Sequence, residues 1–153
     1  MNGPAQPETR LSAEQTSPRA PTVAKRLQEA TAAVRSADSL FADLNDRMGV
    51  AFSFSNTVAP DGALFSGGRL LVGPDAVREF YDSRQPGTSL SWRPVFASVA
   101  GSRDLGFTTG EYVTTGRGPS GAAVQRFGKY LTVWGLRRDK TWKFLIDGGN
   151  QTR

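Results

Sequence analysis

Apolar side chains recur at every third or fourth position from Val23 to Met48, and this regularity constrains the fold more than any other feature. Such spacing places side chains on one face of an α-helix. Gly49 follows directly, and glycine commonly ends a helix. Because several positions of the stripe hold small or β-branched residues, a helix facing a core is favoured over a coiled coil. The stripe consists of Val23, Leu27, Ala30, Val34, Ala37, Phe41, Leu44 and Met48.

Shorter segments follow this helix. Residues 50–59 predict a second helix, and residues 60–62 (Pro-Asp-Gly) are expected to close it as a turn. Residues 63–65 and 70–72 are expected as short strands. Residues 75–83 predict a third helix with its apolar side chains and Tyr81 turned inward, since a proline near its first turn is well tolerated.

The second half of the chain reads as four sequential strands with short turns, which predicts an antiparallel meander. Helices followed by a meander give an α+β domain, here residues 23–150. A chain of 153 residues suits one domain with one core. Residues 1–22 are rich in Pro, Ser, Thr, Gln and Ala and predict a disordered tail. The predicted strands cover residues 89–100, 104–116, 123–137 and 141–148.

Histidine and cysteine are both missing from the sequence. This excludes disulfides, thiolate metal sites and nucleophiles activated by histidine. The acidic residues are isolated and lack EF-hand spacing, so no metal is expected. The glycine-rich segments 66–69 and 116–118 lack P-loop spacing, and no cofactor is expected. Any chemistry must therefore use Asp, Glu, Tyr, Lys, Arg, Ser or Thr.

The net charge of +5 is spread along the chain. Only Arg137, Arg138 and Lys140 cluster, beside Asp139 in an expected turn, which favours a solvated surface over a nucleic-acid partner. No apolar run is long enough for a membrane span, and no secretory signal is visible. The compartment is expected to be cytoplasmic by default, or periplasmic if a leader is missing from this chain.

Side chains alternate between the two faces of a strand. Tight turns after the first and third predicted strands would place Trp92 opposite Tyr112 and Thr132 opposite Asp147. One face then mixes aromatic rings, hydroxyls and a carboxylate, which suits a pocket wall. The other is wholly apolar and suits the helix-packed core or a subunit interface. The mixed face holds Trp92, Pro94, Tyr112, Tyr130, Thr132, Trp134 and Asp147, and the apolar face holds Val95, Phe107, Leu131, Val133, Phe144 and Ile146.

Several short motifs, none specific alone, resemble in their order and spacing the SnoaL-like branch of the nuclear transport factor 2-like superfamily. The resemblance implies a cone-shaped α+β fold, with N-terminal helices packed on a curved antiparallel sheet around a cavity. The family includes ketosteroid isomerases, polyketide cyclases, dehydratases and members of unknown function, and it often dimerises through the sheet. The motifs are Ala59-Pro60-Asp61-Gly62, the segment from Gly73 to Phe80, Leu90-Ser91-Trp92-Arg93-Pro94, Asp104-Leu105-Gly106-Phe107-Thr108-Thr109-Gly110, Gly128-Lys129-Tyr130-Leu131-Thr132-Val133-Trp134, and Trp142-Lys143-Phe144 running into Asp147.

Asp147 is the first candidate for chemistry, because a carboxylate among apolar residues has a raised pKa and can act as a base or as a neutral donor. The structural alternative is that it caps or pins the sheet by bonding Thr132, an arginine or the backbone. Tyr112 and Tyr130 are candidate donors to a ligand carbonyl, with a role as core residues as the alternative. No helix residue clearly matches the helix-borne tyrosine of characterised relatives.

Three functions follow from these candidates. The first is a domain that binds a small hydrophobic molecule through the mixed face, with Trp92 and Trp134 stacking on it beside Thr132. The second is an isomerase, cyclase or dehydratase in which Asp147 is the acid–base and a tyrosine the donor. The third is a non-catalytic module that forms a homodimer through its sheet. Asp46 and Arg93 are candidate charged groups at a pocket rim, with solvated surface as their alternative.

Overall fold

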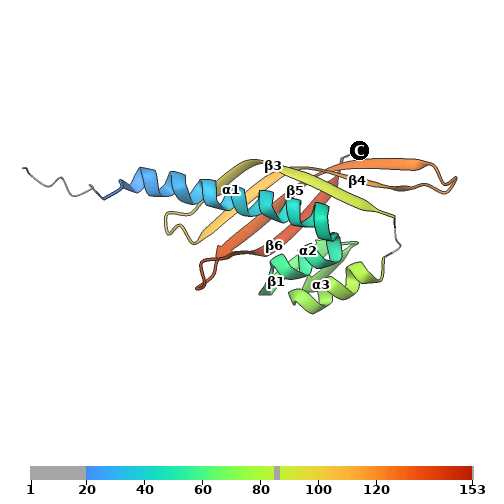
Figure 1. Cartoon of the computed structure of the whole chain (residues 1–153), viewed down its shortest axis with the longest axis horizontal. Helices are drawn as coiled ribbons and strands as arrows, with labels where there is room; N and C mark the ends of the chain where they lie inside the picture. Colours follow the sequence, from blue (N-terminus) through green and yellow to red (C-terminus); the bar gives the residue numbers. More distant parts are fainter. Residues whose placement is uncertain (1–19, 85–86, 153) are drawn as a thin grey trace, which may run out of the picture.

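The computed structural model describes residues 20–84 and 87–152, so most of the tail predicted over residues 1–22 lies outside them. Figure 1 shows the helices on one side of a sheet. Most predicted boundaries lie close to the observed ones, but β1 begins at Val58 instead of residue 63, and the last strand runs three residues past its predicted end. The elements are α1 (Val23–Met48), α2 (Val50–Thr57), β1 (Val58–Ser66), β2 (Arg69–Val72), α3 (Gly73–Asp82), β3 (Ser89–Val99), β4 (Leu105–Arg117), β5 (Ala123–Leu136) and β6 (Trp142–Gln151).

The six strands form one open sheet in the order β2-β1-β6-β5-β4-β3. The meander β3 to β6 is antiparallel, as predicted. The sheet as a whole is mixed, because β1 runs parallel to β6. The turn expected at residues 60–62 is wrong: these residues lie inside β1, where the register shifts between Val58 and Ala63. Such a bulge lets a strand accommodate proline, which cannot donate to the ladder.

Helix α1 begins and ends where its apolar stripe does. Thr22 caps it by accepting a hydrogen bond at 3.2 Å from the backbone N–H of Lys25, and Gly49 ends it at φ 82°. The first turns of α1 project past the sheet, so Val23 is 71% exposed (Figure 1). From Val34 onward the helix packs on the sheet, which confirms a core-facing helix for this part.

The cross-strand pairs Trp92–Tyr112 and Thr132–Asp147 form as predicted. Each hairpin nevertheless contains a register shift, one between Pro94 and Phe96 and one between Val133 and Trp134. The second shift places Phe144 opposite Trp134 on the helix-covered face, where it is fully buried. The assignment of Phe144 to the apolar face was therefore wrong, because one bulge reverses the alternation beyond it.

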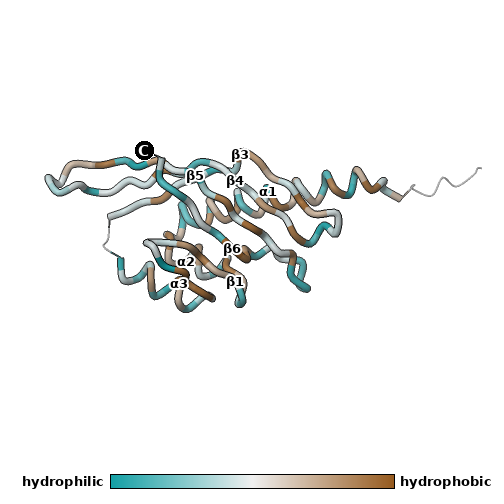
Figure 2. Tube along the Cα trace, turned by 180° about the vertical axis from the view of Figure 1, so that it is seen from behind, coloured by the Kyte–Doolittle hydropathy of each residue, from teal (hydrophilic) through white to brown (hydrophobic). Residues whose placement is uncertain are grey.

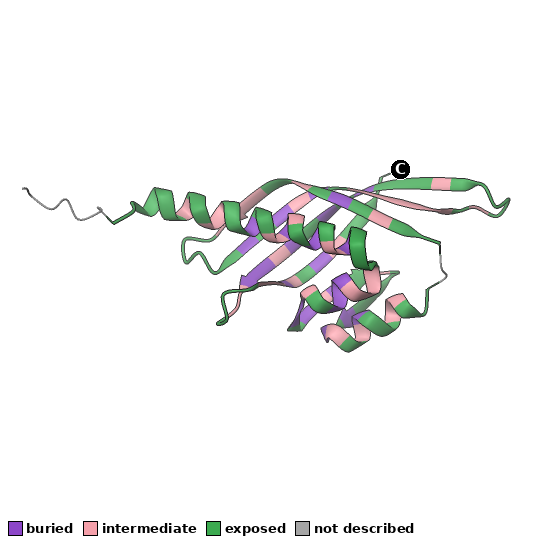
Figure 3. Ribbon diagram, in the orientation of Figure 1, coloured by how far each residue is buried: buried purple, intermediate pink, exposed green. Residues whose placement is uncertain are grey.

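The helices cover the mixed face of the sheet, which we call the inner face. Figure 3 shows buried residues concentrated where the helices meet the strands. The expectation that the purely apolar face could carry the helices is wrong, since that outer face is largely exposed. Hydrophobic residues recur along the strands seen from behind in Figure 2. The large exposed residues of β3 to β6 are Val95, Phe96, Leu105, Phe107, Phe127, Leu131 and Ile146.

The core lies between α1, α2 and the inner face. Phe41 is at its centre, with its ring centroid 4.7 Å from Phe54 and 4.8 Å from Trp92 in edge-to-face contacts. Such aromatic pairs add to the stabilisation that burial of their area provides. None of the helices in the described residues has the length and hydrophobicity needed to cross a membrane.

Candidate functional site

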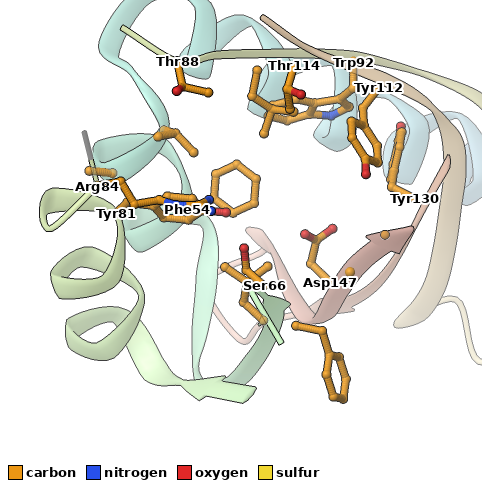
Figure 4. Close-up of a pocket in the computed structure, with 18 of the residues that line it drawn as sticks. Phe54, Ser66, Tyr81, Arg84, Thr88, Trp92, Tyr112, Thr114, Tyr130 and Asp147 are labelled. Atoms are coloured by element: carbon orange, nitrogen blue, oxygen red, sulfur yellow. The ribbon is translucent and has the colours of Figure 1, made fainter. Parts of the chain in front are cut away.

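A cavity of about 1460 Å³ opens between the inner face of the sheet and helices α2 and α3. Aromatic rings from both layers line it, as Figure 4 shows. Its polar groups come from the strands, from α3 and from the residues that follow α3. A wall that combines apolar area with polar groups able to orient a ligand is typical of small-molecule sites. The aromatic lining residues are Phe41, Phe54, Phe65, Tyr81, Trp92, Tyr112 and Tyr130.

Asp147 lies on β6 and points its carboxylate into this cavity (Figure 4). Thr132 on the neighbouring strand donates a hydrogen bond at 2.5 Å to Oδ1 of Asp147. The other oxygen has no hydrogen-bond partner among residues 20–84 and 87–152. Burial raises the pKa of Asp147 from 3.8 to about 7; the Thr132 hydrogen bond opposes this rise, and the charge of Asp38 adds to it.

Asp38 is a buried acidic residue that the sequence patterns did not point to. It lies on α1 and is fully buried. Its Oδ1 accepts a hydrogen bond from the indole N–H of Trp92 at 2.8 Å, and its Oδ2 accepts one from the hydroxyl of Tyr130 at 2.8 Å. Its spacing in the sequence could have predicted its burial, because Asp38 is four residues after Val34 and three before Phe41 and so lies on the same face of the helix.

Tyr130 lines the cavity, but its hydroxyl proton is directed at Asp38. Burial and then the Asp38 charge raise the pKa of Tyr130 far above its usual value. While that hydrogen bond is made, Tyr130 can accept from a ligand but cannot donate to it.

Tyr112 has a different environment. Its hydroxyl has no hydrogen-bond partner in the described part of the chain, and Figure 4 shows it on the same side of the cavity as Asp147. Its ring lies over the backbone of Gly128, where a Cβ atom would collide with it, and beside Gly149, where a Cβ atom would be only 3.0 Å from it. Two glycines therefore make room for this ring on the cavity wall.

Tyr81 on α3 is a further lining residue, so a helix does supply a tyrosine to the cavity. Burial raises the pKa of Tyr81 to about 12, the Ser66 hydroxyl opposes this rise, and Asp147 adds to it. Figure 4 shows Tyr81 on the wall across from Tyr130. The inward direction predicted for Tyr81 was the signal, but its role at a site was not recognised.

The structure brings four of the six candidate site residues to the cavity: Trp92, Tyr112, Tyr130 and Asp147. Thr132 and Trp134 do not line it. Thr132 lies behind Asp147 and is 1% exposed. Trp134 is fully buried and donates from its indole N–H to Thr108 at 2.8 Å. Both are core residues in this structure.

The two candidate rim charges lie outside the cavity lining. Arg93 and Asp46 form an exposed ion pair of 3.2 Å between β3 and α1. They therefore lie on the solvated surface, which was the alternative to a place at the pocket rim. Within the described ranges, no three Asp or Glu side chains gather as metal ligands.

Comparison with known proteins gives matches in structure and none in sequence. No family profile matches the chain, and no curated protein matches it significantly. A ketosteroid isomerase-like protein from Erwinia carotovora atroseptica has a TM-score of 0.70 at 19% identity, over 82% of this chain and 98% of that one. A hexachlorocyclohexane dehydrochlorinase has a TM-score of 0.67 at 16% identity, over 82% of this chain and 90% of that one.

A third similar structure is the association domain of C. elegans CaMKII, with a TM-score of 0.62 at 15% identity over 80% of this chain and 98% of that one. A Salmonella enterica protein of the nuclear transport factor 2-like superfamily is similar as well. At these identities the likeness establishes the fold alone. This chain therefore has the α+β fold of the nuclear transport factor 2-like superfamily.

Proposed function

We propose that this protein binds a small, mostly apolar molecule in the cavity and that Asp147 exchanges a proton with it. The observation that carries the proposal is the free carboxylate oxygen of Asp147, which faces an aromatic cavity while Thr132 holds the other oxygen. A buried carboxyl with a pKa of about 7 is present in both protonation states near neutral pH. A general acid–base is most effective in that range.

The chemistry that suits this wall is proton transfer at a carbon next to a carbonyl. Asp147 would take the proton as base, and the enolate oxygen that forms would accept a hydrogen bond from Tyr112, whose hydroxyl is uncommitted. The proton then returns from Asp147 to a second carbon, so the step is an isomerisation without a co-reactant. The ketosteroid isomerase-like protein and the dehydrochlorinase of similar fold support this class only by analogy.

A β,γ-unsaturated cyclic ketone tests this reaction, because its conversion to the conjugated isomer changes the ultraviolet absorbance. We expect turnover that rises with pH around 7 and falls at least about a hundredfold in Asp147→Asn, the range that general acid–base groups contribute. Asp104→Asn, an exposed carboxyl in the β3–β4 turn, is the matched control and should keep full activity. Equal rates in the two variants would remove Asp147 from the mechanism.

Binding is measured separately from turnover. Titration calorimetry with the conjugated product should give saturable one-site binding to the native protein and to Asp147→Asn alike. Binding without turnover would leave a non-catalytic binding domain. No binding at millimolar concentration would overturn the pocket proposal itself.

A second candidate function is self-association through the outer face. Seven large apolar residues of β3 to β6 are exposed there, a larger cluster than single exposed apolar residues require. The CaMKII association domain of similar fold supports an oligomeric role by analogy. Sedimentation equilibrium should give a dimer for the native chain and a monomer for Phe127→Asp/Leu131→Asp. A native monomer at 100 micromolar protein would rule this candidate out.

A further inference from the structure

Three arginines border the cavity from three different elements: Arg69 at the start of β2, Arg84 just after α3 and Arg126 on β5. We propose that they bind the anionic group of the ligand, so that the natural ligand is a carboxylate attached to an apolar ring system. This inference rests on the proposed function, since it specifies the ligand class of the same cavity.

Two of these guanidinium groups lie against the same aromatic ring, that of Phe80. The Cζ atom of Arg84 lies 4.9 Å from the centre of the Phe80 ring, and that of Arg69 lies 5.9 Å from it. Contacts of this kind attract a cation to the ring. Gly67 packs closely against the same ring, which fixes the β1–β2 turn beside α3. Phe80 therefore contacts two of the three positive charges that border the cavity.

None of the three arginine side chains has a hydrogen-bond or ion-pair partner in the part of the chain that the structure describes. Elsewhere on the molecule, arginines do find carboxylates: Arg78 pairs with Asp82, and Arg137 pairs with Asp61. Like charges that border one cavity without a counter-charge repel each other. A bound anion would relieve that repulsion, and this is the physical reason to expect one here.

The described lining residues also carry more positive than negative charge. Asp147 is its single acidic residue, against the three arginines. Guanidinium groups match the planar carboxylate with two parallel hydrogen bonds. The interior beyond them is aromatic, with Phe54, Trp92 and Tyr112 on its walls. The cavity therefore offers a charged edge and an apolar interior to an amphipathic acid, which can place its ring toward Asp147.

A pair of probes of equal size separates charge from apolar binding: 2-naphthoate and 2-naphthamide, each titrated by calorimetry in 50 millimolar salt. We expect 2-naphthoate to bind at least about tenfold more tightly, which corresponds to about 1.4 kcal/mol. In Arg69→Gln/Arg84→Gln this preference should fall to about twofold or less, while the affinity for 2-naphthamide stays within about twofold of native. Arg126→Gln alone should lower the preference for 2-naphthoate partially.

Arg103→Gln/Arg138→Gln is the control matched in net charge. Both arginines are exposed in the β3–β4 and β5–β6 turns, at the end of the meander away from the β4–β5 turn, and neither lines the cavity. This variant should keep the full preference for 2-naphthoate. If both double variants lose the preference equally, net charge alone attracts the anion and the assigned arginines are wrong.

The remaining outcomes distinguish the two proposals. Equal affinity of the native protein for the two probes would overturn the anion site and leave the binding pocket in place. No binding of either probe at millimolar concentration would overturn the pocket and the anion site together.

Discussion

The carboxylate of Asp38 accepts a hydrogen bond of 2.8 Å from the hydroxyl of Tyr130, although the two residues are 92 positions apart in the chain. The same carboxylate accepts from Trp92, so one side chain of α1 binds both β3 and β5. A buried carboxylate is stable only when such partners replace its water. This contact fixes α1 across the sheet and sets the wall of the cavity next to Asp147.

Replacement of Asp38 by asparagine should destabilise the fold by about 2 kcal/mol, because the amide nitrogen cannot accept from the Tyr130 hydroxyl, whose proton loses its charged acceptor. Urea unfolding followed by tryptophan fluorescence measures the change. Asp43→Asn, an exposed carboxyl of the same helix that pairs with Arg93 at 3.6 Å, should change stability by less than about 1 kcal/mol.

Tyr130→Phe tests whether the stability lost in Asp38→Asn comes from the hydrogen bond between Asp38 and Tyr130. In the Tyr130→Phe background the hydroxyl is gone, so Asp38→Asn should cost clearly less than in the native protein. Fully additive losses would show that the two side chains are not coupled.

The ionisation of Asp147 should make stability depend on pH. Burial raises its pKa from 3.8 to about 7, so between these values the folded protein holds a proton that the unfolded chain has released. The contribution of Asp147 to stability therefore falls as pH rises through this window, by up to about 4 kcal/mol at its upper end.

Asp147→Asn removes this dependence, and the variant should gain stability relative to the native protein as pH rises from 4 to 8. Urea unfolding at four pH values measures the difference, with Asp104→Asn as the control that follows the native curve. A native advantage that grows with pH would mean that the pKa of Asp147 is lowered, contrary to this structure.

The hydrogen bond from Thr132 should lower the pKa of Asp147, since it stabilises the charged form. Thr132→Val keeps the shape of the side chain and removes the donor, so we expect the pKa to move above 7. A carbon-13 NMR titration of the Asp147 carboxyl, assigned by its loss in Asp147→Asn, reports the shift. Thr108→Val removes a buried threonine hydroxyl from the neighbouring strand and should leave this pKa unchanged. An unchanged or lower value in Thr132→Val would contradict the assigned role.

Gly128→Ala should disturb the cavity wall at Tyr112. The new Cβ would lie 2.5 Å from the carbonyl oxygen of Asn150 and would also overlap the Tyr112 ring. Overpacking of this kind destabilises by about 1–3 kcal/mol, which urea unfolding can measure. Gly101→Ala, where a Cβ meets no atom within 4 Å, is the control and should stay close to native stability. Native stability in Gly128→Ala would show that both the Tyr112 ring and the Asn150 carbonyl can move away at no cost, contrary to this prediction.

The hairpin registers show where reasoning from sequence holds and where it stops. The pairing of Thr132 with Asp147 was predicted from a tight turn at residues 139–140. The ladder next to that turn is offset by one position from the prediction, and the register shift between Val133 and Trp134 restores the expected pairing beyond it. Phe144 lies between the turn and the shift, and for that reason it alone was assigned to the wrong face. A bulge has no local sequence signature strong enough to place it.

Local patterns alone determined the long helix from Val23 to Met48, the order of helices before the meander and the alternation that brings Tyr112, Tyr130 and Asp147 to one face. These features follow from the spacing of apolar residues and from turn-forming residues that act on their neighbours. Only the tertiary structure decided that β1 joins β6 in parallel, that the helices cover the mixed face, and that Asp38 binds Trp92 and Tyr130. Those outcomes depend on contacts between residues far apart in the chain, whose free energies no local pattern contains.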